Sequence, residues 1–228
     1  MPQSLSRASL AVVASPRQTV ADRVTELLRE GIQKGDYAPG QRLIEAELTA
    51  SFGVSRNALR ESMRRLAGEG VIVIEPHRGA VVRRISKREI ADLMLLRERV
   101  EGLAAGLAAR NSVGESGRRR FDKILDRMRR AVRSGLLREY FEMNTSFHSL
   151  VAELADNKFL SEFIVNIKQP TIRLQFIQFT GSGDAAESLH DHEKIAAAIL
   201  SGKQAAAERA MRSHIRRASK NLLAVNER

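Results

Sequence analysis

Apolar positions follow the period of helices over most of this chain. The clearest case lies between Pro39 and Ile74, where Leu59, Met63 and Leu66 recur at spacings of three and four residues. This spacing places the three side chains on one face of a helix. The opposite face carries long cations and small polar groups, at Ser55, Arg56, Asn57, Arg60, Arg64 and Arg65. A helix with one apolar face and one such polar face suits the major groove of DNA.

A glycine turn, Phe52-Gly53-Val54, joins this helix to a shorter apolar pattern at Leu43, Ala46, Leu48 and Ala50. Glycine accepts positive φ, so the shorter helix can end there, and Ser55 can cap the next helix. Two helices joined in this way cross steeply. Arg56 and Asn57 would then project from the first turn toward guanine and adenine, and Arg60, Arg64 and Arg65 toward phosphates. For any one of these arginines, the alternative is a solvated helix surface.

Around this unit the sequence predicts a helix from Thr19 to about residue 34, a break over 35–40, and two short strands at 71–74 and 80–82. The strands would form a hairpin wing with its tip at His77, Arg78 and Gly79. Such a tip suits a minor groove or a phosphate, although an exposed turn is the simpler reading. Arg42, in the segment before the shorter helix, is a further candidate DNA contact.

From Ser86 onward every segment is predicted to be helical. Ser86 and Glu89 form a capping-box pattern. Helices are expected at about 87–110, 116–134, 137–155, 158–179, 184–200 and 203–224, and their short connections imply an antiparallel bundle. The predicted fold class is therefore mainly α, in three parts: a flexible arm at 1–17, a winged helix-turn-helix domain at 18–84, and an all-helical domain at 85–228.

Three of the five histidines lie on the predicted inner faces of the bundle. Asn144 and His148 are four residues apart and share a helix face, and His192 and His214 lie on the last two predicted helices. Imidazoles that converge from several helices can bind a divalent metal and leave positions open for a ligand. The alternative for each histidine is an ordinary core residue beside an apolar face.

Two stretches resemble known families. VSRNALRESMRRLAGEGVI resembles the signature of the GntR family of transcriptional regulators, and PGQRLIEAELTASFG resembles the segment that precedes it. Asn57, Ala58 and Thr49 depart from the usual Thr, Pro and Ala. Residues 86–224 resemble the all-helical FCD effector domain of the FadR subfamily. Three segments carry this resemblance: Arg97-Glu98-Arg99-Val100-Glu101, Phe147-His148 followed by Asp156-Asn157, and His192 with His214-Ile215.

The resemblance implies a metal-assisted effector site. In many FCD domains three histidines and an acidic residue hold a divalent ion, of the Zn, Ni or Mn type, which helps bind a small carboxylate. In this chain the histidines would be His148, His192 and His214, and Asn144 stands at the acidic position. Arg97 would pair with the effector carboxylate, and Arg173 is a weaker candidate for that role.

The same resemblance implies a homodimer that binds a pseudo-palindromic operator in double-stranded DNA. The resemblance also implies that the protein represses a catabolic operon and that the effector relieves this repression, which is the commoner behaviour in the family. A dimer would place two reading helices in successive major grooves.

Composition supports this interpretation only in part. The net charge of +11 and the pI near 10.7 favour a polyanionic partner. Residues 1–86, however, contain 13 basic and 9 acidic side chains, so the larger share of the excess lies in the second domain. The absence of cysteine excludes disulfides and thiolate metal sites and fits the cytoplasm. No apolar run approaches the roughly 18 residues of a membrane span.

Two other functions fit parts of the sequence. A metal-dependent hydrolase could use the three-histidine site, but the chain has no HExxH motif and no evident pattern of catalytic carboxylates. An architectural DNA-binding protein would not need a helical domain larger than its DNA-reading domain. Neither alternative accounts for both halves of the sequence.

Overall fold

The computed structural model describes residues 18–111, 113–167 and 182–225. The chain divides into two compact units, Met1–Arg84 and Ile85–Arg228. The arm expected at 1–17 and the candidate Arg173 lie outside the described residues. No helix in the described ranges is long and apolar enough to cross a membrane.

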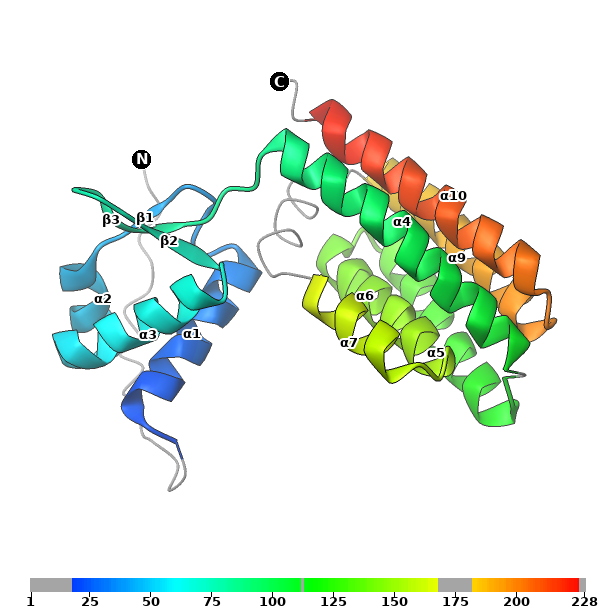
Figure 1. Cartoon of the computed structure of the whole chain (residues 1–228), viewed down its shortest axis with the longest axis horizontal. Helices are drawn as coiled ribbons and strands as arrows, with labels where there is room; N and C mark the ends of the chain where they lie inside the picture. The colour runs from blue at the N-terminus through cyan, green and yellow to red at the C-terminus, as the bar shows by residue number, and fades with distance from the viewer. Residues whose placement is uncertain (1–17, 112, 168–181, 226–228) are drawn as a thin grey trace. The chain divides into compact units, whose positions relative to one another are not determined.

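The first unit combines three helices with a small antiparallel sheet (Figure 1). Its elements are α1 (Val20–Lys34), β1 (Arg42–Leu43), α2 (Glu45–Phe52), α3 (Arg56–Gly68), β2 (Ile72–Glu75) and β3 (Gly79–Val82). The strand order is β1-β3-β2, with Arg42 opposite Val81 and Ile72 opposite Val82. The sequence predicted only the β2–β3 hairpin. Strand β1 was missed because two residues are too few to show an alternating pattern.

The core of this unit lies between α1 and α3. Val24, Leu28, Leu59 and Leu66 are buried between these two helices, which contact each other along their length. The buried hydroxyl of Ser62 donates a hydrogen bond of 2.8 Å to the carbonyl oxygen of Ala21. This bond satisfies a polar group that would otherwise be costly to bury. It also fixes α3 against α1, so that the opposite face of α3 is presented to solvent.

The second unit is an all-helical bundle (Figure 1). Its helices are α4 (Lys87–Arg110), α5 (Glu115–Arg133), α6 (Leu137–Leu154), α7 (Lys158–Ile167), α9 (Ser182–Leu200) and α10 (Gln204–Val225). Their described bounds agree with the sequence prediction to within two residues, apart from the end of α7. The helix expected at 158–179 is described only to Ile167, and the rest lies outside the described residues. Ser86 and Glu89 form the predicted capping box.

Helix α4 packs closely against α10. A Cβ atom added at Gly102 would lie 2.5 Å from Cγ of Arg212, so a glycine is needed for this approach. The α10 guanidinium groups of Arg212 and Arg216 both bond to the buried carboxylate of Glu98 on α4. The interaction holds the pKa of Glu98 below its usual value, mainly through the hydrogen bond from Arg216. These contacts fix two of the helices that surround the buried histidines.

Candidate functional site

The helix-turn-helix geometry follows from the residues that the sequence singled out. Gly53 ends α2 in the left-handed region at φ 64°, and its N–H bonds to the carbonyl oxygen of Thr49. Helix α3 then starts after Ser55, whose hydroxyl accepts a hydrogen bond of 3.3 Å from the amide of Ala58. The glycine supplies a conformation that most residues adopt only with strain, and the serine satisfies an amide of the first helical turn.

Helix α3 has the two faces that the sequence predicted. Leu59, Met63 and Leu66 are buried, whereas Arg56 and Asn57 are exposed on the first turn. The exposed pair begins the helix, which is the part of a recognition helix that enters the major groove. The structure therefore leaves guanidinium and amide groups accessible at the position where base edges would be read.

The other three arginines of α3 are also exposed, but each contacts a carboxylate. Arg60 lies 3.0 Å from Glu45, and Arg64 lies 2.9 Å from Glu61. Arg65 contacts Glu61 and Asp22, and the hydrogen bond to Asp22 is the main cause that raises the pKa of Arg65. Exposed ion pairs are held weakly in water. Phosphate oxygens can therefore replace these carboxylates without exposing buried surface.

The wing has its turn between β2 and β3, and His77 and Arg78 are exposed there. His77 and Gly79 both have positive φ, at 61° and 76°. Arg78 lies 2.8 Å from Glu75 at the end of β2. Arg42 is exposed on β1. The sequence placed Gly79 at the tip of the turn, whereas in the structure it begins β3.

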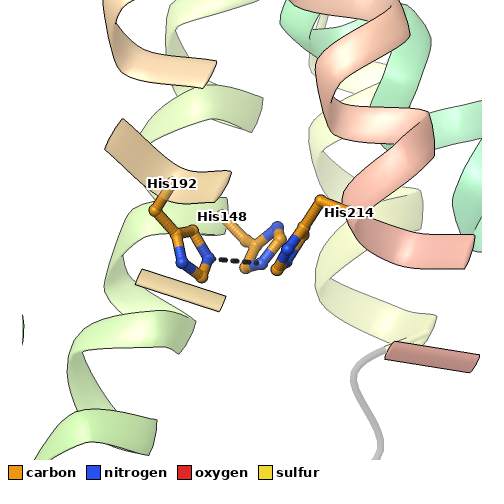
Figure 2. Close-up of side chains that lie close together, drawn as sticks. All are labelled: His148, His192 and His214. Atoms are coloured by element: carbon orange, nitrogen blue, oxygen red, sulfur yellow. Dashed lines mark hydrogen bonds between the residues drawn. The ribbon is translucent and has the colours of Figure 1, made fainter. Parts of the chain in front are cut away.

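In the second unit, three buried histidines converge from three helices. His148 lies on α6, His192 on α9 and His214 on α10, and the exposed fractions of the three residues are 3%, 0% and 4%. Figure 2 shows the three rings lying close together. The Nε2 atoms of His148 and His192 are 3.4 Å apart, and one ring nitrogen from each histidine lies within 4.8 Å of the others. The structure thus brings together the three histidines that the sequence proposed as metal ligands.

The aromatic core determines where these rings lie. The ring of Phe147 is centred 4.6 Å from that of His192 and 5.4 Å from that of Phe121 on α5. The Phe147 contact lies against the fully buried ring of His192, where a charged imidazole is disfavoured. Burial, and after it the electrostatic influence of the neighbouring imidazoles of His214 and His148, lower the pKa of His192 well below its ordinary value. His192 is therefore neutral at pH 7, which is the form that binds a metal.

Two buried carboxylates lie behind the cluster. Oε2 of Glu101 is 2.5 Å from Nδ1 of His148, and Oδ2 of Asp191 is 3.4 Å from Nδ1 of His214. A carboxylate on one ring nitrogen fixes the tautomer and leaves Nε2 as an electron-pair donor. Nε2 of His148 and Nε2 of His192 share a hydrogen bond when one of them carries the proton, and a divalent ion between the rings would replace that proton and use both lone pairs. The donor set therefore fits a divalent ion of the Zn, Ni or Mn type.

Each carboxylate is itself held by an arginine. Nε of Arg97 donates a hydrogen bond of 2.7 Å to Oε1 of Glu101, and Arg217 donates one of 2.7 Å to Oδ1 of Asp191. The sequence pattern alone did not place Glu101 and Asp191 at this site. The spacing of Arg97 and Glu101 by four residues was a usable signal, whereas nothing local connects Asp191 to His214, 23 residues later.

The remaining candidates are less directly placed. Asn144 is half-buried one helical turn before His148 on α6, on the same side of that helix. Arg97 was expected to pair with an effector carboxylate, and in the structure it is bonded to the carboxylate of Glu101. That bond uses Nε of Arg97, so an effector would bind the terminal nitrogens of the guanidinium group.

Models of known protein families match both units of the chain. Residues 20–82 match the model of bacterial regulatory proteins of the gntR family, and residues 92–217 match the FCD domain. The chain is 30% identical to the HTH-type transcriptional repressor RspR of Escherichia coli K12, over 93% of each chain. It is also 30% identical to a probable D-xylose utilization operon transcriptional repressor of Paenarthrobacter nicotinovorans, over 87% of each chain.

Solved structures show the same architecture. A putative transcriptional regulator GntR from Rhodococcus sp. RHA1 superposes with a TM-score of 0.75 at 25% identity, covering 90% of this chain and 97% of the other. E. coli McbR/YncC shares the fold, with a TM-score of 0.73 at 17% identity, covering 92% and 98% of the two chains.

These relatives are regulators and not enzymes, so the metal-dependent hydrolase is not supported. An FCD domain is consistent with the FadR subfamily. The chain belongs to the GntR family of bacterial transcriptional regulators and joins a DNA-binding winged helix-turn-helix to an FCD domain.

Proposed function

We propose that this regulator is a repressor of a catabolic operon whose affinity for its operator is set by a small carboxylate. The effector would be held in the FCD domain with the help of a divalent metal on His148, His192 and His214. The observation that carries the proposal is the convergence of these three buried imidazoles, two of them backed by a buried carboxylate. Unlike the buried carboxylate of Glu98, which is paired with two arginines, the three imidazoles point at one another, and a cluster of this kind calls for a ligand.

At the DNA end, Arg56 and Asn57 would read bases, because they are exposed on the first turn of α3. Arg60, Arg64 and Arg65 would bind phosphates, together with Ser55 at the helix start. The wing residues His77, Arg78 and Gly79, with Arg42 on β1, would contact the backbone or the minor groove. A homodimer on a pseudo-palindromic site would present two such surfaces.

At the effector end, the metal would supply a fixed positive charge to which a carboxylate can bind. The three histidines would hold the metal, and Asn144 would offer an uncharged amide oxygen in place of the usual carboxylate. Arg97 would take part through the terminal nitrogens of its guanidinium group, since its bond to Glu101 uses Nε. Arg173 is kept as a weaker candidate, outside the described residues.

Helix α4 is the element through which the effector would act on DNA affinity. It starts at Lys87, directly after the boundary between the two units, and it also carries Arg97 and Glu101. A change in the bonding of these two residues would therefore act on the helix that joins the DNA-binding unit. By linkage, an effector that weakens operator binding must itself bind more weakly to the DNA complex.

The first test is metal analysis of the purified, untagged protein, with a thermal-shift screen of small carboxylic acids. About one divalent ion per chain is expected, and His148→Ala should lose both the ion and any stabilisation by acids. His190→Ala removes an exposed histidine from α9 and should lose neither. Metal-free wild-type protein that no acid stabilises would contradict the effector half of the proposal.

The second test measures DNA binding by fluorescence anisotropy, on fragments selected from random sequence. Arg56→Ala should lower the preference for the selected site over random DNA by about 5- to 150-fold, the value of one good base contact. Arg64→Ala should weaken binding to both DNAs equally and reduce its dependence on salt. An Arg56→Ala protein that keeps its sequence preference would show that α3 does not read the bases through this residue.

A further inference from the structure

Helix α5 carries most of the excess positive charge of the second unit. It contains eight basic and three acidic side chains, which is a net charge of +5. Residues 87–228 as a whole contain 25 basic and 18 acidic side chains, which is a net charge of +7. The rest of this unit is therefore almost neutral, and its positive charge is concentrated on one helix.

Four of the basic side chains lie along the outer side of α5. Phe121, Leu125 and Met128 are buried and mark the side of the helix that faces the bundle. Spacings of four, seven and three residues place the four basic side chains together on the opposite side. All four are exposed, and they are Arg119, Lys123, Arg130 and Arg133. They extend over about 21 Å of the helix axis, and we call this surface the basic α5 face.

Carboxylates neutralise the flanks of α5 more completely than the basic α5 face. The flanking arginines are paired, Arg120 with Glu153 and Arg127 with Glu139 on α6, and Arg129 with Asp126 and with Glu193 on α9. On the face itself, Lys123, Arg130 and Arg133 form no ion pair with any residue that the structure describes. Arg119 lies 3.6 Å from Glu115, and an exposed pair of this kind is held weakly in water. Most of the positive charge on this face is therefore available to a partner.

A hollow at the start of this face suits a phosphate group. It has a volume of about 370 Å³ and is lined by Ser116, Arg119, Arg120 and Lys123. Guanidinium and ammonium groups only donate hydrogen bonds, so this lining is matched to an anion, and arginine suits phosphate oxygens in particular. A compact anion would use the hollow alone, whereas an extended polyanion would use the whole length of the face.

Double-stranded DNA is the polyanion that fits this face best. Its phosphates recur about every 3.4 Å along each strand, so a surface of about 21 Å spans roughly six base pairs. The second unit follows the first directly, at Arg84 and Ile85, so a duplex bound by α3 is tethered to the unit that carries α5. The aromatic side chain of α5, Phe121, is buried, so the face offers no ring on which unpaired bases would stack.

We propose that the basic α5 face binds the phosphate backbone of the DNA that flanks the operator. Contacts with phosphates add affinity without sequence preference, so the reading of bases stays with α3. The inference rests on the DNA end of the proposed function and extends it, because it assigns DNA contacts to the FCD domain as well.

The test is fluorescence anisotropy of the full-length protein on two duplexes that contain the same selected site. One duplex has short flanks, and the other is extended by about 20 base pairs, two helical turns, on each side. The double variant Lys123→Ala with Arg130→Ala should bind the longer duplex about 30-fold more weakly than the wild type at 0.15 M salt. The slope of log affinity against log salt should become shallower by about 1.8 for each bound chain. On the short duplex the variant should match the wild type.

The matched control is the double variant Lys203→Ala with Arg209→Ala. It removes the same charge from two exposed side chains of the same unit, beside and on α10, which packs on α4 and α9. Its affinity for the longer duplex should stay within about twofold of the wild type, because no phosphate contact is lost. Circular dichroism checks that both variants are folded.

Wild-type affinity and salt dependence of the Lys123 and Arg130 variant on the longer duplex would overturn the proposal. An equal loss in the control would show a general effect of net charge and would overturn it as well. An equal loss on both duplexes would overturn the placement on flanking DNA. Failure of the proposed function gives a different result, because Arg56→Ala would then keep its sequence preference whatever the α5 variant does.

Discussion

Replacing Glu101 by Gln should weaken metal binding without unfolding the domain. The carboxylate of Glu101 is 4% exposed and lies 2.5 Å from Nδ1 of His148. Its charge makes that imidazole a better donor and fixes the ring so that Nε2 faces the cluster. Glutamine has nearly the same shape and keeps an acceptor oxygen for Arg97, but it is neutral. The substitution therefore removes charge and leaves packing almost unchanged.

The expected magnitude follows from this geometry. Loss of a carboxylate behind a metal-bound histidine costs 10- to 100-fold in metal affinity, which is about 1.4–2.7 kcal/mol. Since a metal that binds only the folded state stabilises it, the metal-induced rise in unfolding free energy should fall by the same amount. The assay is competition between protein and a chromophoric chelator for the metal, together with thermal unfolding with and without the ion.

Glu98→Gln is the matched control. Glu98 lies on the same helix, three residues earlier, and its side chain is 8% exposed, but it bonds to Arg212 and Arg216 and not to a histidine. This variant should be less stable by about 1–3 kcal/mol, because a buried charged network is broken, yet it should bind metal within about threefold of the wild type. Equal losses of metal affinity in the two variants, or none in Glu101→Gln, would refute the role assigned to Glu101.

Three further predictions concern the first unit. Ser55→Ala removes the hydroxyl that accepts a hydrogen bond from the amide of Ala58, and it should lower the free energy of unfolding in urea by about 1 kcal/mol. An unchanged urea midpoint would show that this cap does not contribute to stability. Gly53→Ala should lower the free energy of unfolding by about 1–2 kcal/mol because alanine is strained at this positive φ, and its Cβ would meet no other atom within 4 Å. An unchanged free energy of unfolding would mean that the backbone of the turn relaxes. The pKa of Asp22 is lowered to about 2, mainly by hydrogen bonds with Thr19, so its contribution to stability is present above pH 3.8 and is lost as the pH falls through about 2. In Asp22→Asn the melting temperature should therefore depend less on pH between 3.8 and 2 than it does in the wild type. An equal dependence on pH in the two proteins would contradict the assignment.

Much of the first unit was predictable because its signals are local. Gly53, Ser55 and the apolar spacing of α3 act within a few residues of one another, so they are visible in the sequence. The contacts made by Arg60, Arg64 and Arg65 were less predictable. Their assignment to phosphates remains a prediction, but the carboxylates that they contact in the structure were not predicted, and one of these, Asp22, lies 43 residues away.

The histidine site was anticipated only partly. The three histidines were selected through their helix positions and the family resemblance, but Glu101 and Asp191 were not assigned to the site. Asp191 adjoins His192 on a helix, and adjacent residues on a helix point to different faces, so it is not expected to face the same centre as His192. It does point elsewhere, and what it reaches is His214 on α10.

By itself, the sequence determined the two domain types, most helix bounds in the bundle, and the polar face of the reading helix. These depend on caps, turns and apolar periods, which are contacts over three or four residues. Tertiary structure alone decided which polar groups meet in the bundle, such as Glu98 with Arg216, 118 residues later, and which apolar stripe of α4 stays exposed. A helix pattern shows that a residue lies on a face, but the neighbour of that face is set by how the helices pack.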